Sequence, residues 1–198
     1  KHAFGVERAV GRAPLRPDWP DLRLAAMHAV LRAKFDQHPA LADVLVGVVN
    51  PSGHLAETIP RRLQDTPSYL NFPGEQGHVR YGEGVFVGYR WHEATDRPAL
   101  YPFGHGLSYT TFTVGDLSAE TSGADKVRAE VTVTNTGDRP GKHVVQLYVA
   151  TTAGPVRRPI RELRAFAKPF LRPGESVAVT FDLERRAFAY WDVRQRGW

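Results

Sequence analysis

A short segment near the middle of the chain combines aromatic side chains with side chains that donate hydrogen bonds. Tyr89, Arg90, Trp91 and His92 follow one another without interruption. Aromatic faces can stack on the C–H groups of a sugar ring, while arginine and histidine can donate hydrogen bonds to its hydroxyls. These residues are therefore the candidate substrate-binding residues. The alternative, which we favour for Tyr89 and Trp91, is that they pack one domain against another.

These four residues lie within residues 84–112, a stretch that is dense in aromatic residues and glycines. Each large side chain buried there would contribute roughly 1.5–3 kcal/mol of transfer free energy. Glycine permits tight turns and left-handed backbone. The pattern predicts a segment packed on two sides, with Gly104 and Gly106 at positive φ.

The glycines of residues 82–88 are spaced differently from those of a nucleotide-binding loop. They read G-x-G-x-x-x-G, whereas the dinucleotide fingerprint needs G-x-G-x-x-G at the start of a helix. Val87, Tyr89 and Trp91 then alternate as strand-forming residues. The sequence thus predicts an extended segment here and no nucleotide site.

The residue types also exclude several catalytic mechanisms. The chain has no cysteine and no G-x-S-x-G, so thiolate and elbow-serine nucleophiles are excluded. Its eight histidines include no i, i+4 pair and no H-E-x-x-H, so we expect no metal. We expect no other cofactor either.

The charge distribution argues against two classes of partner. The net charge is +5 and the isoelectric point about 9.7, but acidic and basic residues are interspersed. A nucleic-acid-binding protein would concentrate its basic residues on one element or face. We therefore expect no nucleic-acid partner. No run of 18 apolar residues occurs, so we expect no membrane span either.

The first half of the chain mixes helical and irregular patterns. Residues 1–20 are rich in proline and glycine, and residues 21–38 have helical apolar spacing that ends before Pro39. Residues 41–49 predict a short helix, with Leu41, Val44 and Leu45 on its apolar side, that leads into a turn. Residues 71–81 predict a polar loop with exposed Glu75, His78 and Arg80.

The second half of the chain alternates in the manner of β-strands. Apolar residues occupy every second position from Val127 to Val133, which is typical of a half-buried strand. Regular turn signals separate the following segments and predict a β-sandwich. The further strands are expected at residues 144–149, 163–170 with an interruption at Pro169, 176–183, and from Phe188 through Tyr190 and Trp191.

Several motifs together resemble the C-terminal portion of family 3 glycoside hydrolases of the β-glucosidase type. They are ALADVLVGVVNPSGHLAETIPRR at 40–62, YLNFPGEQGHVRYGEGVFVGYRW at 69–91, YPFGHGLSYTTF at 101–112, and the β-patterned tail from 131 to 183. These motifs occur in the family's order and cover about four fifths of the chain.

This resemblance implies an α+β chain with two parts. Residues 1–111 would be the end of an α/β sandwich domain with connecting loops, although residues 1–38 depart from the family's glycine-rich pattern. Residues 112–198 would form a fibronectin type III-like (immunoglobulin-like) sandwich. That sandwich would lack its last strand, since the family continues beyond the position of Trp198 and would leave an edge open here.

The resemblance also implies a function for a parent protein. It would be a retaining, exo-acting β-glucosidase whose nucleophile lies in a barrel domain and whose acid/base lies on an earlier loop, so that this chain holds no catalytic residue. Its partners would be a glucoside and the missing barrel domain. Its acidic residues near the candidate sugar-binding segment are expected to be surface acids rather than a catalytic pair: Glu75, Glu83, Glu93 and Asp96. A free-standing carbohydrate-binding or assembly module is the alternative.

Overall fold

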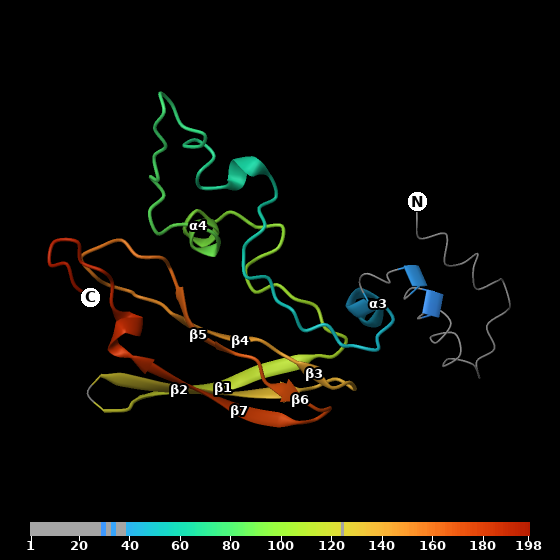
Figure 1. Cartoon of the computed structure of the whole chain (residues 1–198). Helices are drawn as coiled ribbons and strands as arrows, with labels where there is room; N and C mark the ends of the chain where they lie inside the picture. The colour runs from blue at the N-terminus through green and yellow to red at the C-terminus, as the bar shows by residue number, and fades with distance from the viewer. Residues whose placement is uncertain (1–28, 31–32, 35–38, 124) are drawn as a thin grey trace, which may run out of the picture. The chain divides into compact units, whose positions relative to one another are not determined.

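The computed structural model describes residues 29–30, 33–34, 39–123 and 125–198 (Figure 1). The chain divides into two compact units, Lys1–Pro51 and Ser52–Trp198. The irregular segment expected at residues 1–20 lies outside the described residues. So does most of the helix expected at residues 21–38, of which residues 29–30 and 33–34 are helical.

In the first unit the described helix is α3, Pro39–Leu45, which confirms the short helix predicted there. Proline suits the first turn because its missing N–H has no helical partner there. Ala42 is the buried residue, whereas Leu41 and Leu45 are about half exposed. The amide of Gly47, which has φ of 77°, donates to the carbonyl of Val44 just after the helix. Glycine takes this left-handed conformation at low cost and so ends the helix.

The β-sandwich of the second unit has one three-stranded antiparallel sheet. Its order is β1 (Phe112–Thr121), β2 (Lys126–Asn135) and β7 (Ser176–Glu184). Buried and exposed residues alternate along β2 and β7, as the sequence predicts. β1 is absent from the predicted strands because nearly all of its residues are exposed, so it carries no alternating signal.

A second layer faces this sheet and encloses the core (Figure 1). It contains the pair β4 (Val145–Val149) and β5 (Glu162–Ala167) and the short pair β3 (Gly141–Lys142) and β6 (Phe170–Leu171). In the described part of the chain, β4 is hydrogen-bonded to β5 alone. The core comprises side chains from both layers: Ala129, Val131, Val133, Val145, Leu171, Val179 and Phe181.

One strand prediction in the tail is confirmed and another is wrong. The strand expected at residues 163–170 is interrupted at Pro169 as predicted, because proline has no N–H to continue a ladder, and the short strand beyond it, β6, pairs with β3. The strand expected from Phe188 is the end of a 3₁₀ helix, η2 (Arg185–Phe188). The carboxylate of Asp192 then accepts hydrogen bonds from the backbone N–H groups of Arg194 and Gln195. Such a local turn competes with strand pairing.

The connection between the amino end of this unit and β1 folds back on itself. Leu55 donates to the carbonyl of His105, and Leu100 donates to that of Ile59, both at 2.8 Å. Two segments far apart in sequence therefore run antiparallel, and beyond them the chain extends away from the sandwich (Figure 1). This distal part contains the 3₁₀ helix η1 (Leu63–Asp65).

The two glycines predicted at positive φ differ. Gly104 has φ of 83°, as expected, whereas Gly106 lies outside that region. A Cβ at Gly106 would lie 2.6 Å from the carbonyl oxygen of Gly53, so glycine is required there for close approach. The expected two-sided packing of residues 84–112 is also wrong in part, because Tyr101 and Tyr109 remain more than two fifths exposed.

None of the helices in the part of the chain that the structure describes is long and apolar enough to span a bilayer.

Candidate functional site

The four candidate sugar-binding residues lie on a helix, α4 (Tyr89–Ala94), so the extended segment predicted there is wrong. Gly88 precedes the helix with φ of 56°, a conformation that turns the chain out of its previous direction. At the other end, the backbone N–H and the hydroxyl of Thr95 both donate to the carbonyl of Trp91, at 3.0 and 2.8 Å. Helical spacing places successive side chains about 100° apart, and it therefore separates residues that a strand would have aligned.

Tyr89 joins α4 to the sandwich. Its ring packs at 5.1 Å from the ring of Phe103 and at 5.8 Å, edge to face, from that of Tyr148 in β4. Its hydroxyl accepts the backbone N–H of Leu163 in β5 at 2.9 Å. Both the face and the polar end of Tyr89 are thus used within the fold.

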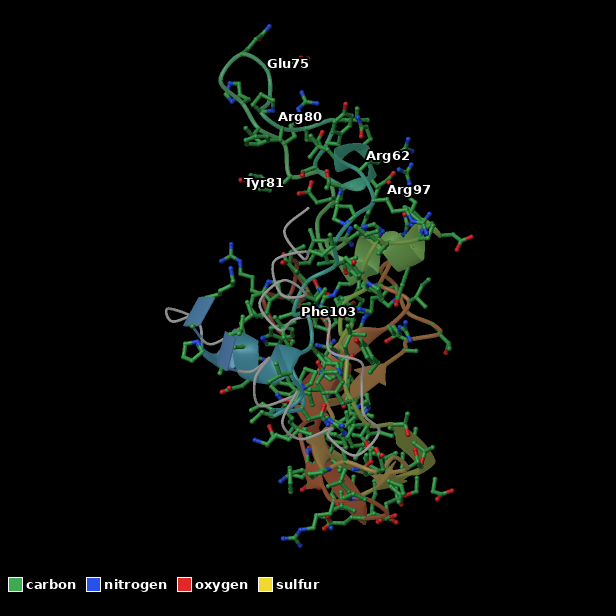
Figure 2. All side chains as sticks on the ribbon, turned by 90° about the vertical axis from the view of Figure 1, so that its right-hand side faces the viewer. Arg62, Glu75, Arg80, Tyr81, Arg97 and Phe103 are labelled. Carbon is green, nitrogen blue, oxygen red and sulfur yellow. The ribbon has the colours of Figure 1, made fainter. Side chains whose placement is uncertain are left out.

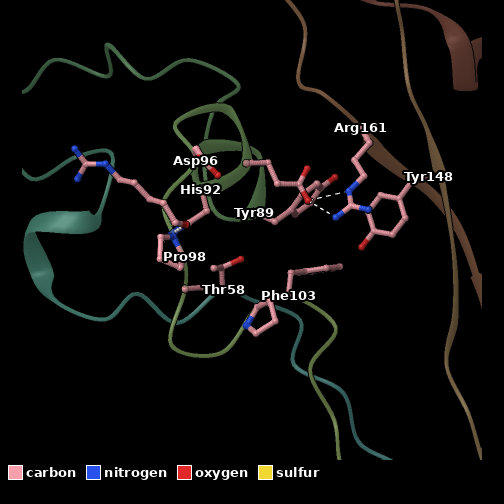
Figure 3. Close-up of a pocket in the computed structure, with 12 residues that line it drawn as sticks. Thr58, Tyr89, His92, Asp96, Pro98, Phe103, Tyr148 and Arg161 are labelled. Atoms are coloured by element: carbon pink, nitrogen blue, oxygen red, sulfur yellow. Dashed lines mark hydrogen bonds and ion pairs between the residues drawn. The ribbon is translucent and has the colours of Figure 1, made fainter.

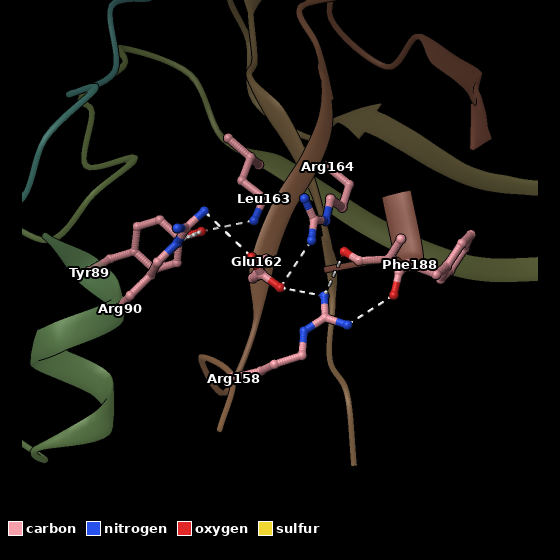
Figure 4. A network of polar contacts seen from close by, with 8 residues as sticks. Tyr89, Arg90, Arg158, Glu162, Leu163, Arg164 and Phe188 are labelled. Atoms are coloured by element: carbon pink, nitrogen blue, oxygen red, sulfur yellow. Dashed lines mark hydrogen bonds and ion pairs between the residues drawn. The ribbon is translucent and has the colours of Figure 1, made fainter. Parts of the chain in front are cut away.

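Arg90 contributes to a cluster of charges around Glu162 at the start of β5 (Figure 4). The Glu162 carboxylate lies 3.7 Å from Arg90, 2.6 Å from Arg158 and 3.0 Å from Arg164. Arg158 also donates to the carbonyl of Phe188 at 2.9 Å. One largely buried carboxylate therefore connects α4, the segment before β5, β5 itself and η2.

His92 and Trp91 have different surroundings. His92 is buried, and its Nδ1 lies 2.9 Å from the carbonyl oxygen of Arg97, so the ring closes the turn that follows α4. Trp91 is half-buried, and its indole N–H has no partner among the described residues. Of the four candidate residues, Trp91 is the one with a buried side-chain polar atom that has no partner in the part of the chain described.

A cavity of about 490 Å³ opens beside α4 (Figure 3). Glu93 pairs with Arg161, with 2.8 Å between Oε1 and Nε, and the Arg161 guanidinium lies 5.1 Å from the ring centre of Tyr148. Burial and the neighbouring Tyr89 raise the pKa of Tyr148. The cavity is lined by these residues and by Thr58, His92, Asp96, Arg97, Pro98, Ala99, Pro102 and Phe103.

Two residues that line this cavity each have a buried polar atom without a partner in the described residues. The atoms are the hydroxyl of Thr58 and Oε2 of Glu93. Together with the Arg161 guanidinium they could bind the hydroxyls of a small polar molecule. The aromatic rings of Tyr89, Phe103 and Tyr148 pack on one another, which limits their use as stacking faces. Sequence reasoning missed Thr58, Tyr148 and Arg161 because each comes from a segment distant from α4.

The acidic residues named from the sequence are dispersed. Glu75 lies at the tip of a hairpin, Glu93 pairs with Arg161, and Asp96 is exposed at the cavity rim. Glu83 is half-buried, and its Oε2 has no partner among the described residues. In the same described ranges, no group of three or more histidine, aspartate or glutamate side chains is arranged to hold a metal ion.

Comparison with known proteins gives consistent results over the two halves of the chain. Residues 11–109 match the profile of the glycosyl hydrolase family 3 C-terminal domain, and residues 143–198 match that of the fibronectin type III-like domain. The first match includes residues 11–38, where the glycine-rich pattern is lacking.

Similar curated proteins are glycosidases. The chain is 47% identical to the thermostable β-glucosidase B of Acetivibrio thermocellus over 94% of its own length and 25% of that protein. It is 49% identical to an exo-α-(1→6)-L-arabinopyranosidase of Bifidobacterium longum, over 81% of this chain and 21% of that one. The chain thus spans about a quarter of the length of these relatives.

Solved structures agree with the sequence comparison. A family 3 β-glucosidase of Bifidobacterium adolescentis superimposes with a TM-score of 0.78 at 52% identity, covering 81% of this chain and 24% of that one. The β-glucosidase 3B of Thermotoga neapolitana, in complex with glucose, gives 0.73 at 41% identity, covering 78% and 22%.

Proposed function

The chain belongs to glycosyl hydrolase family 3, and we propose that it is the C-terminal part of a retaining, exo-acting β-glucosidase. In this role it supplies scaffold and an accessory domain, while the barrel domain and the catalytic residues belong to the part of the enzyme that this chain lacks. The observation that carries the proposal is the 47% identity with a β-glucosidase over nearly all of this chain but a quarter of that enzyme.

The ion pairs of the described residues support a structural role for this chain. Retaining glycosidases need two carboxyl groups about 5–5.5 Å apart, across the scissile bond. The half-buried or buried carboxylates of Asp65, Glu93 and Glu162 each contact at least one arginine. Such carboxylates serve to hold the fold together, and catalysis in the parent enzyme falls to other residues.

The substrate is a glycoside of an exo-acting enzyme, and a glucoside is the first candidate. The second candidate is an arabinopyranoside, because an arabinopyranosidase is as similar to this chain as the glucosidases are. The candidate contacts Tyr89, Arg90, Trp91 and His92 remain a prediction, and the packing of Tyr89, Arg90 and His92 favours a structural role for three of them.

Residues 112–198 form the accessory domain in this proposal, and residues 1–111 complete the preceding α/β sandwich domain. We expect a further strand to follow Trp198 in the parent enzyme and to complete the sandwich. The second layer, in which β4 has a single described neighbour, offers an edge for such a strand.

A free-standing carbohydrate-binding module has less support. It requires exposed stacking faces at Tyr89 and Trp91, whereas Tyr89 packs between two rings. An assembly role within a larger enzyme uses these same contacts without any further requirement.

The proposal is tested by comparing the natural polypeptide with the isolated 198-residue chain. We expect an antibody against this region to detect a protein several times the mass of the 22.1 kDa chain. Purified, that protein should hydrolyse a nitrophenyl β-glucoside or α-L-arabinopyranoside, while the isolated chain should hydrolyse neither. Hydrolysis by the isolated chain that is lost in Glu75→Gln or Glu83→Gln would contradict the proposal.

A further inference from the structure

A hairpin-like projection of the second unit, which we call the arm, exposes many large apolar side chains. The arm comprises residues 69–87 and extends away from the sandwich (Figures 1 and 2). Three of these side chains are more than two thirds exposed: Leu70 at 90%, Phe72 at 71% and Tyr81 at 81%. The others, at two fifths exposed or more, are Tyr69, Val79, Val85 and Val87.

The backbone of the arm is held by local hydrogen bonds rather than by apolar packing. At the tip, Glu75 and His78 exchange backbone hydrogen bonds of 3.0 and 2.9 Å. Gly74 has φ of 91°, and a Cβ there would lie 2.1 Å from the carbonyl oxygen of His78, so the tight turn needs glycine. Local backbone contacts therefore define the turn of the arm, while its apolar side chains remain in solvent.

The exposed apolar area of the arm is large for one short segment. Leu70, Phe72 and Tyr81 together expose on the order of 400 Å². The largest apolar patches of monomeric proteins are of this size and are often functional. Glu75 and Arg80 lie towards the tip of the arm (Figure 2). Exposed apolar residues with polar residues around them are the usual composition of a protein interface.

We propose that the arm is the surface that packs against the catalytic part of the same polypeptide, which this chain lacks. This inference rests on the proposed function, because it requires a longer enzyme. The other three quarters of the relative's length lie outside this chain and are long enough to include a domain that covers the arm. A stable contact needs roughly 800 Å² from each side, and the exposed residues of the arm supply the apolar centre of such a contact.

Hydroxyl-radical footprinting tests the proposal without substitutions. The oxidation rates of Phe72 and Tyr81 are measured by mass spectrometry in the full-length protein from the source and in the isolated chain. Phe166, 70% exposed on β5, is the matched control. We expect labelling of Phe72 and Tyr81 to be about tenfold slower in the full-length protein, as in the dry centre of an interface, with Phe166 unchanged.

Three outcomes would overturn the proposal. Equal labelling of Phe72 and Tyr81 in both proteins would mean that nothing covers the arm. If Phe72 and Tyr81 are oxidised more slowly as the concentration of the isolated chain rises, a second copy of the chain covers the arm. If their oxidation in the isolated chain is slow at every concentration, another segment of these 198 residues covers it.

A substitution pair provides an independent measurement. Leu70→Asp with Phe72→Asp should lower the melting temperature of the full-length protein, whereas Phe166→Asp should leave it nearly unchanged. The same arm variant should leave the melting of the isolated chain unchanged, because these side chains contact little there; a drop in that melting would contradict the proposal.

The activity of the full-length protein separates this proposal from the proposed function. Glycoside hydrolysis with an unprotected arm would remove this inference alone. A protected arm in a full-length protein that hydrolyses no glycoside would leave the interface and remove the proposed function.

Discussion

Asn135 is fully buried at the end of β2, and its side chain makes four hydrogen bonds. Its Oδ1 accepts from the hydroxyl of Thr110 at 2.7 Å and from the amide of Gly137 at 3.1 Å. Its Nδ2 donates to the carbonyls of Arg139 at 2.7 Å and Leu171 at 3.1 Å. One amide therefore holds together the segment before β1, the turn after β2, and β6.

We predict that Asn135→Leu destabilises the isolated chain by about 2–4 kcal/mol. The leucine side chain can neither donate nor accept, and each buried partner left without a hydrogen bond costs about 1–3 kcal/mol. Urea unfolding followed by circular dichroism measures the difference. The control is Thr136→Ala, which removes an exposed hydroxyl contact and should cost less than about 0.5 kcal/mol. Equal effects of the two variants would contradict this role for Asn135.

His143 provides a pH-dependent contribution to stability. Its ring stacks on Phe112 at 4.9 Å and lies edge-on to His54 at 5.8 Å. Burial and the neighbouring His54 lower the pKa of His143. The unfolded chain therefore takes up this proton at a higher pH than the folded chain does.

We predict that stability is full above the ordinary histidine pKa and falls as the pH decreases from there towards the lowered pKa of His143. Below that value the loss levels off, because both states carry the proton. Thermal melts between neutral and mildly acidic pH test this. His143→Phe keeps an aromatic ring on Phe112 and removes the titrating group, so its melting temperature should fall less over this range. Parallel curves for the two proteins would show that another group is responsible.

At the scale of elements, side-chain contacts attach α4 to β4, to β5 and to Arg161, the residue before β5. Tyr89 packs on Tyr148, Arg90 pairs with Glu162, and Glu93 pairs with Arg161. A helix of six residues is too short to be stable alone, so these contacts decide its conformation. The strand propensity of its aromatic residues is overridden.

We predict that Glu162→Gln destabilises the chain by about 2–4 kcal/mol. The substitution leaves three arginines close together without their carboxylate, and removal of one partner from a buried charge cluster is costly. Thermal unfolding measures the effect. The near-ultraviolet circular dichroism signal should also decrease, because the aromatic packing of Tyr89 becomes less fixed.

The matched control is Asp182→Asn. Asp182 pairs with Arg128 across β2 and β7, and both side chains are about half exposed. Exposed ion pairs contribute little to stability because water screens them, so this variant should melt close to the unchanged chain. A larger effect for Asp182→Asn than for Glu162→Gln would contradict the role assigned to the cluster.

At the scale of the whole molecule, the second unit combines a well-packed part with an open part. The sandwich has a core of alternating apolar residues from two layers. The arm has no comparable core, and its largest side chains are exposed. Regions with few buried contacts open at low free energy, so the two parts should differ in their resistance to proteolysis.

We predict that chymotrypsin cuts the isolated chain first in the arm, after Leu70 and Tyr81. Phe181 in β7 is buried and should be cut last, since cleavage there requires the sandwich to unfold. Limited digestion followed by mass spectrometry identifies the order. First cuts within β2 or β7 would contradict the division into a stable sandwich and an open arm.

Local pattern was sufficient for the parts of the fold in which one face of a segment is buried. The alternation at Val131 and Val133 predicts β2, and a similar pattern predicts β7, because a strand's side-chain period of two reports directly which side is buried. The motifs at residues 40–62, 69–91 and 101–112 likewise identify the family, because their residues and their order can be read directly from the sequence.

The tertiary structure alone decided what the site is made of. Tyr89 meets Leu163 across 74 residues, and Arg161 meets Glu93 across 68. No local period encodes such pairs, so α4 was mistaken for a strand and Tyr148 and Arg161 were missed. The same reason explains the arm: apolar residue types indicate burial, but whether a surface is covered depends on which chain packs against it.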